Sequence, residues 1–305
     1  MSNSRRPILT VLLIIVVAAI VLGSALSVAI HIFSPSADLL FSEKIGVIPV
    51  EGAITSSQNV TSQLVKFRKD KSIRAIILKI NSPGGAIAPS QEIYREVQKT
   101  IPVKKVVAAM GTVAASGGYY IAAAASRIVA NPGTITGSIG VIVEFVNMED
   151  LLNKIGVDLE IVKSGEFKDM GSPDRKLTDK EREILQALVM DMQNQFMEAI
   201  ARGRRLPLEK VRAMADGRVF SGAQARELGL VDFLGNFQDA VETTKELAGI
   251  KGEVTLIYPE KSGLELLDLL LDTGVRFAAR LIRDLRCRVE YRWNGLSGLQ
   301  IRESY

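Results

Sequence analysis

The sequence predicts an α/β domain with a largely parallel β-sheet, preceded by one membrane-spanning helix. Two patterns indicate the domain: β-branched apolar runs that end in Gly and Pro, and amphipathic segments that alternate with them. A third pattern indicates the membrane helix. Residues 7–33 contain no charged side chain unless His31 is protonated, and they exceed the roughly 20 apolar residues that cross a bilayer as a helix.

The charges around this apolar segment predict its orientation. Two arginines precede it and no positive charge follows it before Lys44, so the positive-inside rule places residues 1–6 in the cytoplasm. Because a cleaved signal peptide has a shorter apolar core of about 7 to 15 residues, we interpret 7–33 as an uncleaved signal-anchor. Residues 34–43 then form a tether to an extracytoplasmic domain at 44–260.

Local patterns predict the elements of this domain in order. Runs rich in Val and Ile predict strands at 44–54, 73–85, 104–110, 127–132, 137–146, 158–163 and 253–259. Apolar residues spaced three and four apart predict helices at 57–70, 90–100, 116–126, 177–204, 207–214, 221–228 and 236–248. Ser90 is expected to cap the second helix, and Thr178 with Glu181 has the spacing of a capping box before the longest helix.

Residues 261–305 are expected to form a basic amphipathic helix followed by a tail. From Leu264 onward, Leu and Ile recur on one side of the predicted helix and arginines on another. Such a helix packs on its own domain, packs on a neighbouring subunit, or lies on an anionic lipid surface. The pattern leaves these alternatives open.

The composition disfavours several kinds of site. A net charge of +4 is too small to indicate nucleic-acid binding. One cysteine, Cys287, and one histidine, His31, are too few for an internal disulfide or for a zinc or iron site, so no metal or cofactor is predicted. A Ser-His-Asp triad is almost excluded as well, because His31 lies in the apolar segment.

One serine, Ser116, lies among glycines and alanines in GTVAASGGYYIAAAA, residues 111–125. A serine in such a place often only caps a helix or marks a turn. However, Ser116 follows a predicted strand and begins a predicted helix, whose first N–H groups can stabilise a developing oxyanion. The segment NSPGG, residues 81–85, ends another strand and is either a turn or the second half of an oxyanion hole.

With no histidine outside the apolar segment, a lysine is the side chain best able to accept the proton of Ser116. Burial would have to lower the pKa of that lysine from about 10.4 toward about 7 to 8. Lys168 is favoured, because it lies in the loop KSGEFKDMGSP after a predicted strand. Lys163 lies nearby, and the residues alone leave this alternative open.

Four motifs occur in order along the chain: INSPGG, GTVAASGGYYIAAAA, GTITGSIG and SGEFKDMGSPDRKLT. Together they resemble the short form of the bacterial signal peptide peptidase A family, peptidase family S49, over residues 47–233. The resemblance implies a Clp/crotonase-like fold with repeated β-β-α units and a Ser-Lys dyad. The roles that it implies are Ser116 as nucleophile, Lys168 as general base, Ser138 as the residue that orients the lysine, and Gly117 with Gly85, or its neighbour Gly84, as the oxyanion hole.

The residues and the resemblance together predict a membrane-anchored serine endopeptidase. The resemblance implies cleaved signal peptides and other apolar peptides as substrates, a homo-oligomeric ring, and a single-pass position in the bacterial inner membrane, with lipid contact through residues 7–33. One alternative is an acyl-CoA hydratase or hydrolase, which an extracytoplasmic domain disfavours because CoA is cytoplasmic. Another is a catalytically silent anchored scaffold, which the intact Ser116, Ser138 and Lys168 disfavour.

Overall fold

The computed structural model describes residues 16–24, 26, 42–259 and 288–292. The chain divides into two compact units, of which the larger consists of Lys44–Lys251 and Leu256–Tyr305 and the smaller of Met1–Glu43 and Gly252–Thr255. In the smaller unit, residues 16–24 are helical. None of the helices in the described part of the chain combines the length and the apolar character of a membrane span. The rest of the predicted span at 7–33, and the tether up to residue 41, lie outside the described residues.

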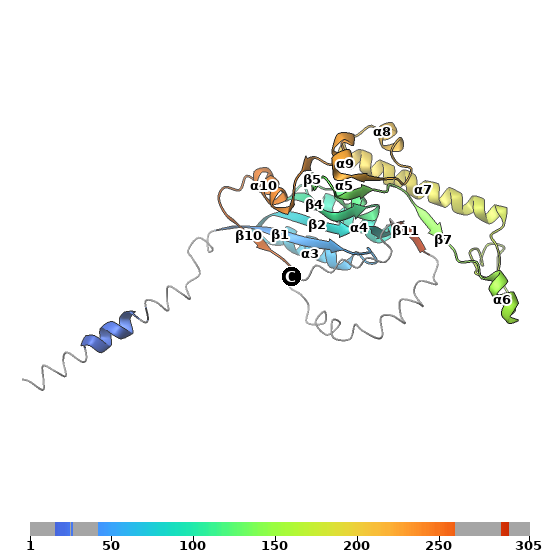
Figure 1. The fold of residues 1–305 in the computed structure, drawn as a ribbon, viewed down its shortest axis with the longest axis horizontal. Helices are drawn as coiled ribbons and strands as arrows, with labels where there is room; N and C mark the ends of the chain where they lie inside the picture. Colours follow the sequence, from blue (N-terminus) through green and yellow to red (C-terminus); the bar gives the residue numbers. More distant parts are fainter. Residues whose placement is uncertain (1–15, 25, 27–41, 260–287, 293–305) are drawn as a thin grey trace, which may run out of the picture. The chain divides into compact units, whose positions relative to one another are not determined.

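The helices and strands follow one another as the alternating pattern predicts (Figure 1). The strands are β1 (Glu43–Glu51), β2 (Ile73–Ser82), β3 (Gly84–Ala86), β4 (Lys105–Ala115), β5 (Arg127–Ala130), β6 (Ile135–Gly137), β7 (Ile142–Glu144), β8 (Val219–Ser221), β9 (Phe233–Leu234), β10 (Val254–Ile257) and β11 (Arg288–Arg292). The helices are α3 (Gln58–Lys69), α4 (Ile87–Thr100), α5 (Gly117–Ala123), α6 (Glu149–Ile155), α7 (Asp179–Arg204), α8 (Leu208–Arg212), α9 (Gly222–Leu228) and α10 (Phe237–Ala248).

The main sheet has eight strands: β10, β1, β2, β4, β5 and β9 lie side by side in that order, β6 pairs with the last three residues of β4, and β8 pairs with β6. The pairs β1 with β2, β2 with β4, and β4 with β5 are all parallel. The predicted parallel α/β sheet is therefore confirmed. Since parallel strands end at the same edge, the loops after β2 and β4 emerge close to each other.

The two faces of the sheet bury alternate residues of each strand. Along β2, the side chains of Ile76, Leu78 and Ile80 join the buried cluster formed with α3, α4, α5 and α7. Between them, Lys79 faces the other side, where its Nζ lies 5.7 Å from the ring centroid of Phe237 on α10. Helices therefore cover both faces, and this arrangement explains why the strands read as nearly continuous apolar runs.

The long helix α7 begins as its sequence predicts. The Thr178 side chain accepts from the Glu181 N–H, and the Glu181 carboxylate accepts from the Thr178 N–H, so the capping box is confirmed. The prediction for Ser90 is wrong. Helix α4 begins one turn earlier, with Ala86 as N-cap, and Ser90 Oγ donates instead to Ala86 O at 2.9 Å.

Three predictions of local secondary structure are wrong over all or part of their length. The predicted strand at 158–163 is irregular, because no described strand lies beside it to pair with its backbone. The predicted strand at 137–146 is formed only at Gly137, the last residue of β6, and at Ile142–Glu144, which is β7. The predicted C-terminal helix is wrong for Arg288–Arg292, which forms β11 because the edges of β3 and β7 accept it. Residues 260–287 and 293–305 of that segment lie outside the described residues.

Candidate active site

Ser116 lies in a sharp turn between the end of β4 and the start of α5. Its backbone has φ 53° and ψ −117°, a conformation that glycine adopts more readily than serine. Its N–H donates to Gly137 O at 2.8 Å. The residue is 1% exposed, and its Oγ has no hydrogen-bond partner among the described residues. A buried hydroxyl without a partner costs about 1–3 kcal/mol of stability. Strained backbone conformations such as that of Ser116 concentrate at functional sites.

Gly84 and Gly85 lie against the first residue of α5. A Cβ added to Gly117 would lie 3.3 Å from both Gly85 N and Gly84 Cα. Gly84 has φ 102° and Gly85 has φ 157°, and a Cβ on Gly85 would lie 2.3 Å from Ile54 O. The N–H of Gly117 belongs to the first helical turn, where no intrahelical acceptor exists. The structure therefore brings the predicted oxyanion-hole residues together, next to Ser116.

Ser138 lies beside the same turn. Gly137 pairs with Ala115 where β6 runs parallel to the end of β4. Ser116 follows Ala115 and Ser138 follows Gly137, so the two serines leave neighbouring strands at the same level. Ser138 is buried, has φ 49°, and donates its N–H to Arg218 O at 2.8 Å. The structure thus places Ser138 close to Ser116 along the sheet edge.

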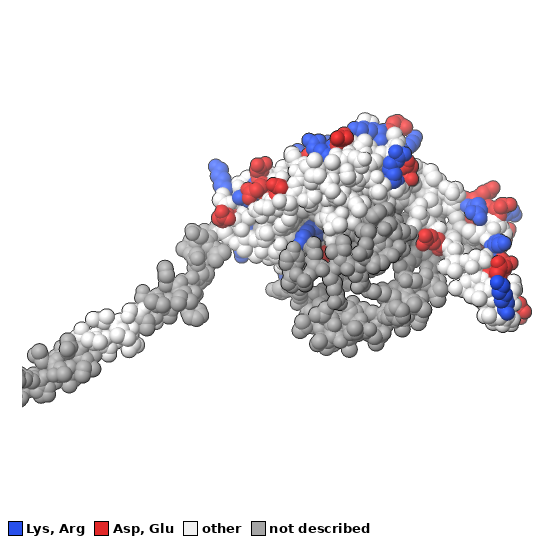
Figure 2. Space-filling view, in the orientation of Figure 1, with Lys and Arg blue, Asp and Glu red and all other residues white. Residues whose placement is uncertain are grey.

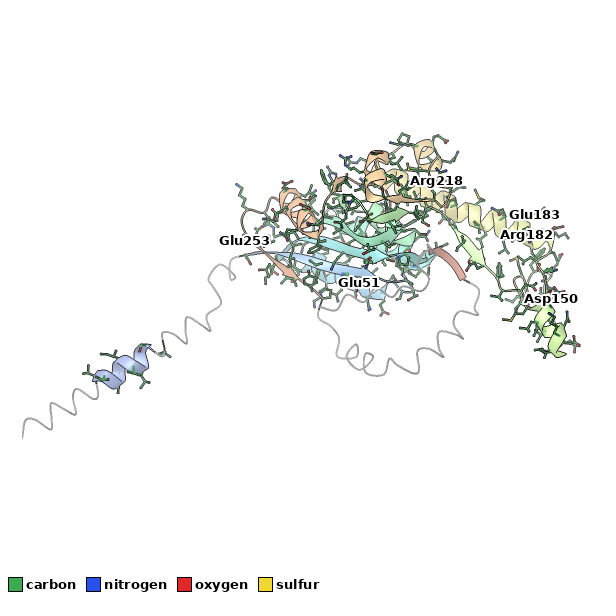
Figure 3. The ribbon with its side chains drawn as sticks, viewed as in Figure 1. Glu51, Asp150, Arg182, Glu183, Arg218 and Glu253 are labelled. Atoms are coloured by element: carbon green, nitrogen blue, oxygen red, sulfur yellow. The ribbon has the colours of Figure 1, made fainter. Side chains whose placement is uncertain are left out.

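Lys168 is exposed, unlike the buried Ser116 and Ser138. It belongs to the segment between β7 and α7, residues 145–178, which we call the arm and which contains α6. The Lys168 side chain is exposed and forms no hydrogen bond or ion pair with the described residues. In Figure 3, α6 with Asp150 and the first turn of α7 with Arg182 lie together, well apart from α5. Because Ser116 Oγ has no hydrogen-bond partner among the described residues, Lys168 of the same chain does not bond to Ser116.

Two protein-family models match this sequence. The model of peptidase family S49 matches residues 98–251, half of the chain, and the model of Clp protease matches residues 29–133. The chain belongs to peptidase family S49. This S49 peptidase is a serine protease, and its mixed α/β sheet is consistent with a Clp protease-like fold.

Relatives of the S49 peptidase bear protease names. "Putative protease slr0021" of Synechocystis is 47% identical over 209 residues, which are 68% of this chain and 76% of that protein. "Putative signal peptide peptidase SppA" of Enterococcus faecium is 42% identical over 193 residues, 62% of this chain and 55% of that protein. "Putative protease MJ0651" of Methanocaldococcus jannaschii is 30% identical over 285 residues, 88% and 91% of the two chains.

Sequence reasoning missed the ion pairs that hold the arm of the S49 peptidase. Arg175 donates to both carboxylate oxygens of Glu181, at 2.8 and 2.6 Å, and its Nη2 lies 3.0 Å from Asp169 Oδ1. Lys163 Nζ also lies 2.7 Å from Asp169. These contacts tie the residue after Lys168 to the first turn of α7. The Arg175 guanidinium lowers the pKa of Glu181 to about 2 and lowers that of Asp169 below its ordinary range.

Two acidic side chains of the arm pair with cations: Asp169 with Lys163 and Arg175, and Glu166 with Lys180. Figure 2 shows charged side chains of both signs intermixed over this part of the surface. Throughout the described part of the chain, no group of three His, Cys, Asp or Glu side chains could hold a metal ion. The RKLT run of the motif could have signalled the Arg175 pair, since a buried glutamate at the start of a helix needs a cationic partner.

One further strand of the S49 peptidase lies at the site. β11 pairs antiparallel with β3, where Tyr291 is opposite Gly85 and Arg292 is opposite Gly84. It also pairs antiparallel with β7, where Val289 is opposite Val143. An extended backbone therefore runs directly beside the glycines of the candidate oxyanion hole. The pattern of residues 288–292 alone did not predict this, since the strand depends on two edges that are distant in sequence.

Proposed function

We propose that this S49 protease is a membrane-anchored serine endopeptidase in which Ser116 is the nucleophile and Lys168 the general base. The buried, unpartnered Oγ of Ser116 in a strained turn beside Gly85 and Gly117 carries the proposal. Ser138, on the neighbouring strand end, orients the lysine amine. The only histidine of the chain lies in the apolar N-terminal segment, so lysine is the available base.

In the proposed reaction, the neutral Lys168 amine takes the proton of Ser116 Oγ as that oxygen adds to the peptide carbonyl carbon. The N–H groups of Gly85 and Gly117 donate to the oxyanion that forms. Collapse of the intermediate breaks the C–N bond, and the lysine ammonium gives its proton to the leaving amine. Water then attacks the acyl-Ser116 ester; its proton passes through the amine to Oγ, and the carboxylic acid product leaves.

We propose that the lysine reaches the serine from a neighbouring copy in a homo-oligomeric ring. The Lys168 side chain has no hydrogen-bond or ion-pair partner among the described residues of its own chain, and the arm lies apart from α5. The arm also exposes large apolar side chains: Val146, Leu151, Ile155, Leu159 and Val162, the last 95% exposed. Exposed apolar surface of this kind marks protein interfaces. A head-to-tail contact that closes on itself makes a ring, in which each arm serves the next copy.

We propose that peptide substrates bind as an added strand between β3 and β7. The antiparallel pairing of β11 with both edges supports this, because an extended backbone fits there and strand addition is a common mode of peptide recognition. The Enterococcus faecium relative carries the name signal peptide peptidase SppA. That name and the predicted anchor at 7–33 support cleaved signal peptides and other apolar peptides as substrates, at the outer side of the bacterial inner membrane.

The experiment that tests this function is cleavage of a synthetic signal peptide by the full chain in neutral detergent. Ser116→Ala and Lys168→Ala are each expected to lower kcat/KM by at least about 10³-fold while the circular dichroism spectrum stays unchanged. Ser62→Ala, which removes an exposed hydroxyl on α3, is the matched control and should cleave normally. Normal cleavage by a folded Ser116→Ala protein would overturn the proposal. Absence of cleavage by a folded, assembled wild type would favour the scaffold.

A further inference from the structure

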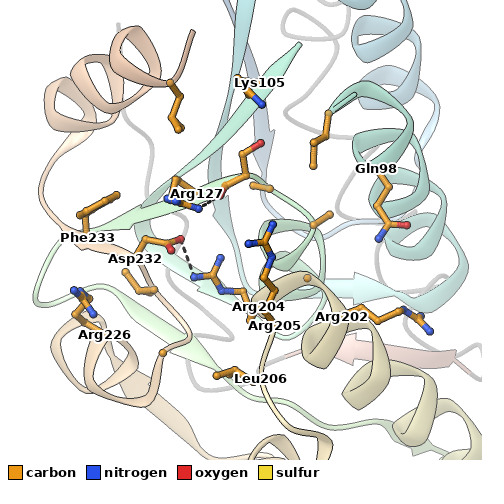
Figure 4. Close-up of a pocket in the computed structure, with 18 of the residues that line it drawn as sticks. Gln98, Lys105, Arg127, Arg202, Arg204, Arg205, Leu206, Arg226, Asp232 and Phe233 are labelled. Atoms are coloured by element: carbon orange, nitrogen blue, oxygen red, sulfur yellow. Dashed lines mark hydrogen bonds and ion pairs between the residues drawn. The ribbon is translucent and has the colours of Figure 1, made fainter. Parts of the chain in front are cut away.

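A second candidate site lies at the opposite end of the sheet from Ser116. A cavity of about 990 Å³ opens beside Lys105 and Arg127, which are the first residues of β4 and β5 (Figure 4). Ser116, in contrast, follows the last residue of β4. The cavity therefore belongs to neither the nucleophile turn nor the β3 and β7 edges.

The lining of this cavity is strongly basic. Its cations are Lys105, Arg127, Arg202, Arg204, Arg205 and Arg226. Its single carboxylate is Asp232, which already accepts from the Ile128 N–H at 2.8 Å and lies 2.7 Å from Arg204 Nη2. The Arg204 side chain is 6% exposed, so this pair forms the buried wall of the cavity.

Four of the cations have no carboxylate partner. Among the described residues, the side chains of Lys105, Arg127, Arg205 and Arg226 form no ion pair, and their one side-chain hydrogen bond is from Arg127 to Ser126 O at 2.9 Å. They come from four separate elements: the starts of β4 and β5, the C-cap of α7, and α9. Elements distant in sequence bring these mutually repelling cations to one cavity. Their combined positive potential raises the local concentration of anions.

The negative ends of three helices offset part of the positive charge of the cavity, but not most of it. The C-cap residues of α4, α5 and α7, which are Ile101, Ala124 and Arg205, all line the cavity. Each helix end carries about half a negative charge. Since Arg204 pairs with Asp232 and Arg202 pairs with Glu198, the three helix ends face four further cations and offset less than half of their charge. A multivalent anion would balance the remaining positive charge.

Arg205 has a backbone conformation that favours glycine, the residue without a side chain. Its φ of 54° and ψ of 40° are left-handed, the conformation that glycine adopts at the C-cap of many helices. The chain places glycine at the corresponding position of α6, α9 and α10. At α7 an arginine occupies the position, at the rim of the basic cavity.

We propose that this cavity binds an anion that carries phosphate groups. Planar guanidinium groups match phosphate oxygens in pairs, and several phosphate charges together would balance the four unpartnered cations. The volume fits a small molecule or a lipid headgroup, either of which supplies the same phosphate chemistry. Because the cavity is remote from Ser116, the bound anion stabilises the fold or the assembly rather than entering the reaction. This inference does not depend on the proposed function.

The test is calorimetric titration of the full chain in neutral detergent with sodium tripolyphosphate, and separately with short-chain phosphatidylglycerol. The double variant Arg205→Gln and Arg226→Gln should weaken binding of the preferred probe by at least tenfold. A matched control, Arg95→Gln with Arg182→Gln, removes the same charge from exposed arginines that do not line the cavity. The control should change the dissociation constant by less than twofold.

The two probes separate the sources of the phosphate. Tighter binding of tripolyphosphate supports a soluble phosphate, and tighter binding of phosphatidylglycerol, with none of short-chain phosphatidylcholine, supports a lipid headgroup. Equal weakening by the cavity variant and the control would overturn the proposal, because binding would then follow net charge alone. Failure of both probes to saturate the folded wild type would overturn it as well.

Discussion

The Ser116 turn and the arm that carries Lys168 differ in how completely one copy of the chain builds them. The turn is buried, tied to β6 through Gly137, and packed against glycines whose replacement would meet backbone atoms. The arm is held to α7 by ion pairs and exposes apolar side chains and Lys168. The parallel sheet therefore preorganises the proposed nucleophile within one chain, whereas in the proposed ring the lysine acts on a neighbouring copy.

The largest expected effect is the recovery of activity when chains that lack the serine are mixed with chains that lack the lysine. Co-expressed Ser116→Ala and Lys168→Ala chains, each inactive alone, should assemble into mixed rings that regain cleavage. If each site takes its serine from one copy and its lysine from the next, random mixing makes about one quarter of the sites complete. The measurement is peptide cleavage by the purified mixed assembly. Complete inactivity of a verified mixed ring would mean that both residues act within one chain.

The second prediction concerns Gly85, the proposed oxyanion-hole glycine beside the Ser116 turn. Gly85→Ala should lower kcat by about 10²-fold or more, because the new Cβ would meet Ile54 O and displace an oxyanion donor. It should also lower the melting temperature. Gly133→Ala is the control, since nothing lies within 4 Å of a Cβ built there. Unchanged kcat in Gly85→Ala would show that the position of this amide is not critical.

The arm should respond to the loss of its anchor. Arg175→Gln removes the contacts with Asp169 and Glu181, and displacement of the Lys168 loop is expected to lower kcat by about 10- to 100-fold. Arg175→Lys should restore part of the loss, with KM nearly constant. Lys180→Gln, which breaks only an exposed pair with Glu166, should have little effect. Equal kcat values for Arg175→Gln and Lys180→Gln would contradict a positioning role.

Removal of the C-terminal strand should favour substrate binding. A chain that ends at residue 287 lacks β11 and leaves the edges of β3 and β7 open, so KM for a peptide substrate should fall several-fold. A chain that ends at residue 292 retains β11 and serves as the control. Steady-state kinetics on both truncated chains measure the difference. A higher KM in the shorter chain would indicate that β11 forms part of the binding surface.

The smallest effect compares two strained residues. Ser116 and Arg205 both have positive φ, but the strain at Arg205 lies far from the proposed chemistry. Arg205→Gly should raise the free energy of unfolding by about 1 kcal/mol by relieving the left-handed backbone. Arg202→Gly, inside the last turn of the same helix, should instead lower it by about 1 kcal/mol. Chemical denaturation measures both, and destabilisation by Arg205→Gly would show that the arginine side chain contributes more than the strain costs.

Much of the fold was predictable because it depends on local pattern. The apolar runs of β1, β2 and β4 and the capping box at Thr178 and Glu181 were read directly from residues close in sequence. The nucleophile candidate followed from Ser116 between a strand and a helix. The absence of any histidine outside the apolar segment pointed to a lysine base. These features need only composition and spacing.

The tertiary structure decided what depends on distant partners. Arg288–Arg292 became a strand because β3 and β7 offer it two edges, although its own sequence resembled a helix. Residues 158–163 stayed irregular because no described strand lies beside them. Only the fold gathered Arg205 and Arg226 into one cavity, and only the fold buried Ser116 Oγ without a partner while it left Lys168 exposed. Local patterns set the conformation of single segments, but pairing, burial and charge balance depend on neighbours that folding supplies.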